Sequence, residues 1–209
     1  MTLLGRWRIP LRLSGYDYSQ PGDYFVTMNT KDRERLFGTI EDGHMLLNDF
    51  GEIVAACWRD LPNHYPYIKI DEFVVMPDHV HGIIVIKANP VREGSEPSRT
   101  EHSRADTSRT DASLPRRHPL SEIVRSFKTF SARRINEIRG VQGVPVWQRN
   151  YFEHIIRNEQ SLKRIREYIS LNPKAWNADV DSEQYLKEDE PGAWLKSTGL
   201  SSTSENNRT

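Results

Sequence analysis

The first half of the chain alternates short runs of β-branched and aromatic residues with polar turns, a pattern that predicts β-strands. The runs span residues 23–30, 36–40, 44–47, 69–75 and 80–86. The first run combines aromatic with β-branched residues, which favours a place near the middle of a sheet. Asp42-Gly43 suits the tight turn of a hairpin, and Pro77-Asp78 marks a second tight corner.

Three stretches instead repeat apolar residues every three or four positions, as amphipathic helices do. They span about residues 48–63, 120–135 and 159–171, and residues 151–157 predict one further strand before the last helix. Asn172-Pro173 predicts the end of that helix, because the residue before a proline avoids helical backbone. This order of elements predicts an α+β fold: one antiparallel, ferredoxin-like sheet with helices packed mainly on one face.

Changes in composition set the predicted domain limits. Residues 1–21 are basic and rich in turn formers, which predicts an entry arm. Residues 88–118 are polar and contain no aromatic residue, so we expect a disordered insertion that buries too little apolar surface to fold. Residues 176–209 predict an acidic, partly disordered tail. The remainder of residues 22–175 then forms a single domain.

The charge of the chain balances as a whole but not locally. Lys and Arg total 29, as do Asp and Glu. Residues 120–174 carry eleven basic and five acidic residues, a net +6, whereas residues 176–209 carry three basic and seven acidic ones, a net −4. This separation predicts a basic surface for a polyanion. Two ordinary solvated helical faces would give the same counts.

Cysteine content and hydropathy bear on the compartment. Cys57 is the only cysteine, which excludes an internal disulfide framework, and its helical context predicts a buried, small apolar residue. No apolar run approaches the ~20 residues of a membrane span, and the N-terminus lacks a hydrophobic signal segment. We therefore expect a cytoplasmic protein without membrane contact.

Two histidines supply the first candidate chemistry. His79 and His81 lie two residues apart on a predicted strand, so their side chains point to the same face. Two adjacent imidazoles can occupy two positions around a divalent metal. Two half-buried strand histidines with ordinary partners would show the same spacing.

Tyr168 and Asn172 supply the second candidate chemistry. They lie four residues apart on the last predicted helix, at the edge of its apolar stripe, and therefore share one side of it. An amide oxygen is a hard ligand that suits Mg²⁺ or Mn²⁺. A phenol is a nucleophile for a phosphate that a metal polarises. A core-edge tyrosine and a helix C-cap before proline are the structural alternatives.

Three motifs together resemble a known family. Met-Pro-Asp-His-Val-His-Gly (76–82), Trp-Gln-Arg-Asn-Tyr-Phe-Glu-His-Ile-Ile-Arg (147–157) and Glu-Tyr-Ile-Ser-Leu-Asn-Pro (167–173) resemble, in this order, the REP-associated tyrosine transposases. These are single-tyrosine transposases of the HUH endonuclease superfamily. The resemblance covers about residues 23–174 apart from the insertion. Asp78 departs from the pattern, in which Asn commonly precedes the first histidine.

The resemblance implies a ferredoxin-like catalytic domain that cleaves and rejoins single-stranded DNA at hairpin-associated sites. The metal, Mg²⁺ or Mn²⁺, would be held by His79, His81 and Asn172, and Tyr168 would form a 5′-phosphotyrosine. The implied partner is single-stranded DNA with hairpin structure, bound by a monomer or a homodimer.

Basic residues around these motifs are candidates for contacts with the DNA backbone, and one tryptophan could stack on a base or belong to the core. The candidate DNA-binding residues are Arg125, Lys128, Arg133, Trp147, Arg149, Arg157, Lys163 and Arg164.

Two other functions fit the residues. One is a non-catalytic regulator that binds structured nucleic acid through the basic face. The other is a metal-dependent hydrolase in which His79 and His81 activate water and Tyr168 is incidental. Retention of Tyr168 with Asn172 favours the strand transferase over the hydrolase.

Overall fold

The computed structural model describes residues 15–88 and 117–176. The predicted entry arm lies largely outside these residues, as do most of the predicted insertion and nearly all of the acidic tail. The elements, in chain order, are β1 (Gly22–Asn29), a short 3₁₀ turn (Lys31–Arg33), β2 (Gly38–Glu41), β3 (His44–Leu47), α1 (Asp49–Arg59), α2 (Leu61–His64), β4 (Ile68–Met76), β5 (His79–Ile86), α3 (Leu120–Ile138), β6 (Phe152–Ile156) and α4 (Glu159–Ala175).

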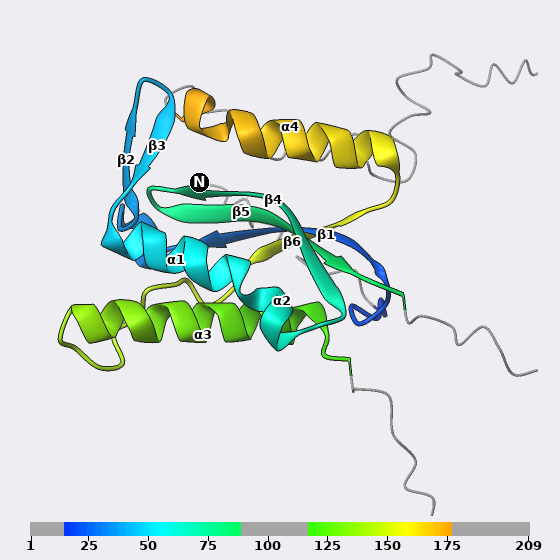
Figure 1. Cartoon of the computed structure of the whole chain (residues 1–209), viewed down its shortest axis with the longest axis horizontal. Helices are drawn as coiled ribbons and strands as arrows, with labels where there is room; N and C mark the ends of the chain where they lie inside the picture. The colour runs from blue at the N-terminus through cyan, green and yellow to red at the C-terminus, as the bar shows by residue number, and fades with distance from the viewer. Residues whose placement is uncertain (1–14, 89–116, 177–209) are drawn as a thin grey trace, which may run out of the picture.

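The main sheet has four antiparallel strands in the order β4-β5-β1-β6. β1 lies between β5 and β6, so the predicted central position of the first strand is confirmed. Helices α1, α2 and α3 cover one face of the sheet, and α4 covers the other (Figure 1). The predicted α+β class and its antiparallel sheet, with most helices on one face, are therefore confirmed, and the strand order is that of the ferredoxin-like plan.

The β2–β3 hairpin corrects the prediction of one continuous sheet. These strands pair only with each other and form a separate two-stranded sheet. Their turn uses Asp42 (φ 50°) and Gly43 (φ 75°), the left-handed pair that a tight hairpin turn requires. A Cβ at Gly43 would lie 3.1 Å from Cγ of Lys174, so the turn abuts the last turn of α4. The hairpin packs against α4 instead of extending the sheet.

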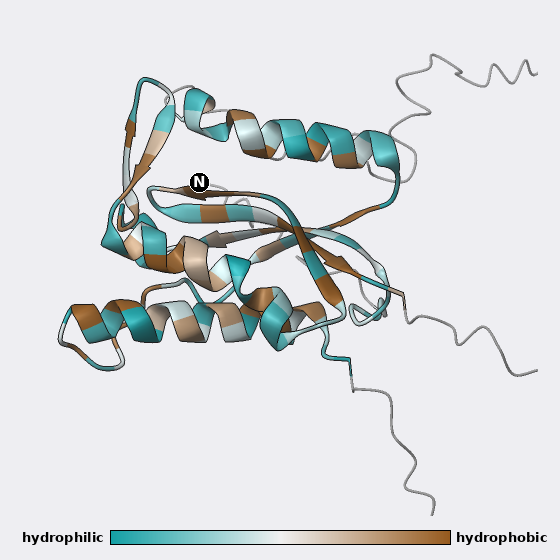
Figure 2. Cartoon of the chain, in the orientation of Figure 1, coloured by the Kyte–Doolittle hydropathy of each residue, from teal (hydrophilic) through white to brown (hydrophobic). Residues whose placement is uncertain are grey.

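Alternation along the central strands divides the core into two layers. Tyr24, Val26 and Met28 of β1 pack toward α1 and α3, whereas Phe25 packs toward α4. Figure 2 shows hydrophobic residues concentrated in the strands, with polar residues spread along the helices. Cys57 of α1 is buried, as predicted.

A glycine brings α1 close to the sheet beside the histidines. A Cβ at Gly82 of β5 would lie 2.4 Å from Cζ2 of Trp58, a clash that the buried indole could not avoid. The absent side chain therefore lets α1 pack directly on the strand that carries His81.

Helix α4 runs further than predicted. It continues to Ala175 with Pro173 inside it, so the prediction that Asn172-Pro173 ends the helix is wrong. A proline there removes one hydrogen bond near the end of the helix, where little of the ladder remains to be disrupted. The extension places Asn172 and the following turn on the same helix as Tyr168. Within residues 15–88 and 117–176, no helix has the length and apolar character needed to cross a bilayer.

Candidate active site

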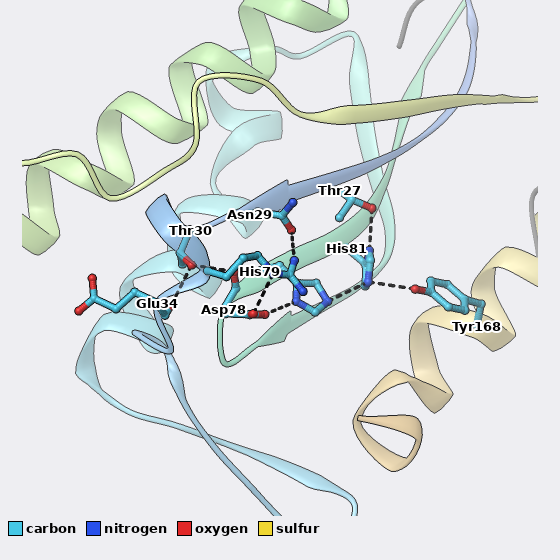
Figure 3. A network of polar contacts seen from close by, with 9 residues as sticks. Thr27, Asn29, Thr30, Glu34, Asp78, His79, His81 and Tyr168 are labelled. Carbon is cyan, nitrogen blue, oxygen red and sulfur yellow. Dashed lines mark hydrogen bonds and ion pairs between the residues drawn. The ribbon is translucent and has the colours of Figure 1, made fainter. Parts of the chain in front are cut away.

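His79 and His81 converge on the α4 side of β5. Val80 between them packs into the core on the opposite face, so alternation directs both imidazoles toward α4. The two histidines are 6% and 3% exposed. Their Nε2 atoms lie 2.9 Å apart (Figure 3). The Nε2 atoms of two histidines from one strand therefore lie next to each other.

The other nitrogen of each imidazole is held by a neighbouring side chain. Nδ1 of His79 donates to Oδ1 of Asp78 at 2.5 Å, because a carboxylate can only accept. Nδ1 of His81 lies 2.8 Å from Oγ1 of Thr27 on β1. Such partners fix the orientation of metal-binding histidines and raise their basicity. Asp78, the departure from the family pattern, thus contacts a predicted ligand directly.

Asp78 is itself tied to the 3₁₀ turn after β1. Its Oδ2 lies 3.0 Å from Nε of Arg33, whose Nη1 also donates to Oδ1 of Asn29 at 2.5 Å. The backbone N–H and the hydroxyl of Thr30 both donate to the carbonyl of Asp78 at 2.9 Å. Arg33 adopts a left-handed backbone (φ 58°), a strain of roughly 1–2 kcal/mol that this network holds in place.

Tyr168 reaches the histidines from α4. Its hydroxyl lies 3.2 Å from Nε2 of His81, and the residue is 7% exposed (Figure 3). The phenol ring packs edge-on against Phe25, with the ring centroids 6.1 Å apart. Ile165, about one turn earlier, and Ile169, the next residue, are buried in the same layer. The position of the hydroxyl therefore follows from the docking of α4.

An ion pair reinforces that docking. Arg166 donates to both oxygens of Asp71 on β4, at 2.9 and 2.7 Å. Asp71 lies where the pairing of β4 with β5 is irregular, between Ile70 and Phe73. This bidentate contact lowers the pKa of Asp71 and fastens α4 to the edge of the sheet two residues before Tyr168.

Trp176 is a site residue that sequence reasoning missed. Its ring stacks on His79, with centroids 5.8 Å apart and planes at 27°, and the guanidinium of Arg35 lies 5.5 Å from the same ring. Tyr168, Asn172 and Trp176 follow one another at four-residue spacing, so they form one stripe along α4. The two ends of this stripe contact His81 and His79, and half-buried Asn172 lies between these ends along the helix.

Burial keeps one imidazole neutral. Desolvation lowers the pKa of His81 well below its ordinary value, and the neighbouring His79 and Arg33 lower it further. A neutral imidazole carries the lone pair that a metal needs. His81 is thus held in its metal-binding form.

The donor set fits a hard divalent cation. The 2.9 Å between the two Nε2 atoms is close to the ~3 Å that separates adjacent ligands of an octahedral Mg²⁺. Among the described residues, no group of three or more His, Cys, Asp or Glu side chains could hold a metal. The sequence-predicted third ligand, the amide of Asn172, is not of these four residue types.

Comparisons with known proteins show relatives of the chain. No protein-family profile matches the chain. An uncharacterized protein of Haemophilus influenzae is 42% identical over 178 residues, covering 82% of this chain and 91% of that protein. A second H. influenzae protein, named "Putative REP-associated tyrosine transposase", is 23% identical over 157 residues, covering 75% of this chain and 73% of the other. The chain is a distant homologue of the REP-associated tyrosine transposases.

A solved structure of a REP-associated tyrosine transposase bound to a REP hairpin is also similar, with a TM-score of 0.49 and 19% identity. The match covers 79% of this chain and 73% of that one.

Four of the candidate DNA-binding residues line one groove. They are Arg125 and Lys128 of α3, Trp147, and Arg149, which precedes β6. Lys128 has a structural role there: its Nζ donates to the carbonyls of Gln148, Arg149 and Asn150. Burial lowers the pKa of Lys128 to about 8. Its donors are directed at backbone carbonyls, so Lys128 has a structural role that its predicted contact with DNA did not include.

Trp147 is a core residue. It is 7% exposed, its Nε1 donates to Oγ of Ser131 at 3.0 Å, and its ring packs against Phe37 and Phe127. Of the two roles predicted for it, the core position is observed.

The remaining candidates do not form one surface with the groove. Arg133 is exposed on α3 and paired with Glu137 at 3.1 Å. Arg157, Lys163 and Arg164 lie around the start of α4, on the layer across the sheet from α3. A basic segment that is continuous in sequence is therefore divided between two faces of the sheet.

Proposed function

We propose that the chain is a metal-dependent single-stranded DNA endonuclease and strand transferase that acts through a 5′-phosphotyrosine. Tyr168 is the nucleophile, and His79, His81 and Asn172 hold Mg²⁺ or Mn²⁺. The substrate is single-stranded DNA with hairpin structure, as the distant relationship to REP-associated tyrosine transposases suggests. The observation that carries the proposal is the convergence of the Tyr168 hydroxyl and the two Nε2 atoms within 3.2 Å.

The chain's own residues prepare the reaction. Asp78 and Thr27 orient the imidazoles, so that the Nε2 atoms share one point without further rearrangement. A cation held by these residues would supply Lewis-acid polarisation of the scissile phosphate and stabilise the charge that develops on it. The hydroxyl of Tyr168, 3.2 Å from Nε2 of His81, would lie beside a phosphate held at that position.

Attack by the Tyr168 oxygen forms a bond to phosphorus as the bond to the 3′ oxygen breaks. The phenol proton passes to solvent, and the departing strand ends in a 3′-hydroxyl. The phosphodiester energy is conserved in the tyrosine ester, so the reverse attack by a 3′-hydroxyl rejoins DNA without ATP. Buried surroundings at Tyr168 keep water away from this ester.

The decisive experiment follows the covalent adduct. The protein is incubated with 5′- and 3′-labelled single-stranded DNA copied from beside its own gene, with Mg²⁺ or Mn²⁺, and then denatured. We expect the DNA segment that carries the new 5′ end to remain attached to the protein. Tyr168→Phe should abolish the adduct and leave metal and DNA binding nearly unchanged, because it removes only the attacking oxygen.

Tyr67→Phe is the matched control, since Tyr67 contacts His118 and lies apart from the histidine pair. It should form the adduct normally. A metal-dependent hydrolase would release both products, form no adduct and tolerate Tyr168→Phe. A non-catalytic regulator would bind the DNA and cut nothing. Cleavage that persists in Tyr168→Phe would refute the proposal.

A further inference from the structure

A groove lies between α3 and the segment 144–151 that leads into β6. Its volume is about 440 Å³, within the ~300–1,000 Å³ of small-ligand sites. The buried side chains of Val124, Val146 and Trp147 form its deep part. Lys128 fixes the outer wall by holding the carbonyls of residues 148–150. The groove therefore has an apolar floor and a wall that is tied in place.

The rim of the groove is cationic. Arg125 and Arg149 are exposed on it, and no carboxylate is among the side chains that line it. Glu122 contacts Arg125 only at 3.5 Å, and the Arg125 side chain is 74% exposed, so this pair is weak. An apolar floor beneath two guanidinium groups matches a ligand with a flat, weakly polar part and an anionic part.

The groove opens at the end of the sheet that carries the histidines. The N–H of Gln148 on its wall donates to the carbonyl of Asn29 at 2.9 Å, and Asn29 pairs with His79 across the sheet. Two strand spacings, about 10 Å, therefore separate Gln148 from His79.

We infer that this groove binds one nucleotide of the substrate strand beside the scissile phosphate. The base lies against the apolar floor, and Arg125 and Arg149 contact the phosphate. The inference rests on the proposed function for the identity of the strand, and it adds a second binding position on the α3 side of the sheet. Arg125 and Arg149 thereby act together, while Lys128 shapes the groove without contacting DNA.

Filling the groove tests the inference. Thr129 is exposed on its rim, and its hydroxyl donates to the carbonyl of Arg125 within α3. Thr129→Trp should raise the Kd for a fluorescein-labelled single strand from beside the gene by about tenfold or more, measured by anisotropy in EDTA. Thr129→Ala, which leaves the groove open, should stay within about twofold of wild type. Equal affinity of Thr129→Trp and wild type would overturn the inference.

Charge removal gives an independent arm. Arg125→Ala and Arg149→Ala should each weaken binding and reduce the salt slope of log Kd by about 0.7, the value for one phosphate contact on a single strand. Lys69→Ala, on the β4 edge far from β6 in the strand order, removes the same charge and should leave the slope unchanged. Equal losses in all three variants would mean unspecific attraction and overturn the groove.

Photocrosslinking keeps the inference testable if Thr129→Trp lowers the melting temperature. A 5-iodouracil oligonucleotide crosslinked to the wild-type protein should modify peptides that cover residues 121–132 or 144–151. Crosslinks confined to other peptides would overturn the inference. If the Tyr168 adduct forms and Thr129→Trp still binds DNA normally, the groove inference is refuted and the proposed function stands. Wild-type protein that binds no single-stranded DNA would remove the groove and the proposed function together.

Discussion

Asp78 offers the sharpest test of how the candidate metal site is built. Its carboxylate accepts from Nδ1 of His79 at 2.5 Å and pairs with Nε of Arg33 at 3.0 Å. Asp78→Ala removes both contacts and leaves the backbone turn in place. Asp78→Asn keeps an amide oxygen that can accept from Nδ1 but loses the charge that faces Arg33.

The expected magnitudes follow from burial. The side chain of His79 is 7% exposed, so a donor left without an acceptor there costs about 1–3 kcal/mol of unfolding free energy. The side chain of Arg33 is 51% exposed, so water replaces its lost partner at little cost. Loss of the group that orients a metal-binding histidine weakens metal affinity about 10- to 100-fold. The loss of metal affinity should lie toward the upper end of this range for Asp78→Ala and toward the lower end for Asp78→Asn.

Isothermal titration with Mn²⁺ at neutral pH measures the affinity directly, and urea unfolding of the metal-free protein measures the stability. Asp32→Asn is the matched control. Asp32 lies in the same 3₁₀ turn with its side chain 80% exposed, and its left-handed backbone (φ 53°) suits Asn. The control removes the same charge nearby without touching a histidine.

Two results would contradict this reasoning. A Kd for Mn²⁺ within twofold of wild type in Asp78→Ala would show that the carboxylate does not orient His79 for a metal. An equal loss of affinity in Asp32→Asn would show that negative charge near the site, rather than the contact to Nδ1, attracts the cation.

Three further changes test the surroundings. Arg166→Ala should lower the unfolding free energy by about 1 kcal/mol near pH 7, measured by urea unfolding. The loss should fade as pH falls below about 4, because the folded-state pKa of Asp71 is lowered and its carboxylate stabilises the fold only while ionised. An equal loss near pH 3 would contradict this. Lys128→Met should cost about 1–3 kcal/mol in the same assay, since three carbonyls lose their donor, whereas unchanged stability would refute its structural role. Trp176→Ala should weaken Mn²⁺ binding a few-fold, because about 0.5–1.5 kcal/mol of stacking on His79 is lost. Trp176→Phe should retain most of the Mn²⁺ affinity. Equal affinities in the two variants would argue against a contribution from ring stacking.

Local patterns in the sequence were sufficient for the elements and for each half of the site. A period of two predicts that His79 and His81 share a face, and a spacing of four predicts that Tyr168 and Asn172 share a side of their helix. Both depend only on backbone geometry within one element. The sequence could therefore predict two pairs, while their meeting across almost ninety residues rested on the family resemblance.

Tertiary structure decided what these patterns cannot contain. The strand order places β5 beside β1. Thr27 therefore contacts His81 and Arg33 contacts Asp78, although no spacing in the sequence indicates either contact. The four-residue spacing of Tyr168, Asn172 and Trp176 could have been found in the sequence. It was overlooked because the helix was expected to end at Asn172-Pro173. Trp147 and Lys128 were assigned by residue type, and burial changed their roles. A side chain's chemistry is written in the sequence, whereas its solvent exposure and partners depend on the elements that pack around it.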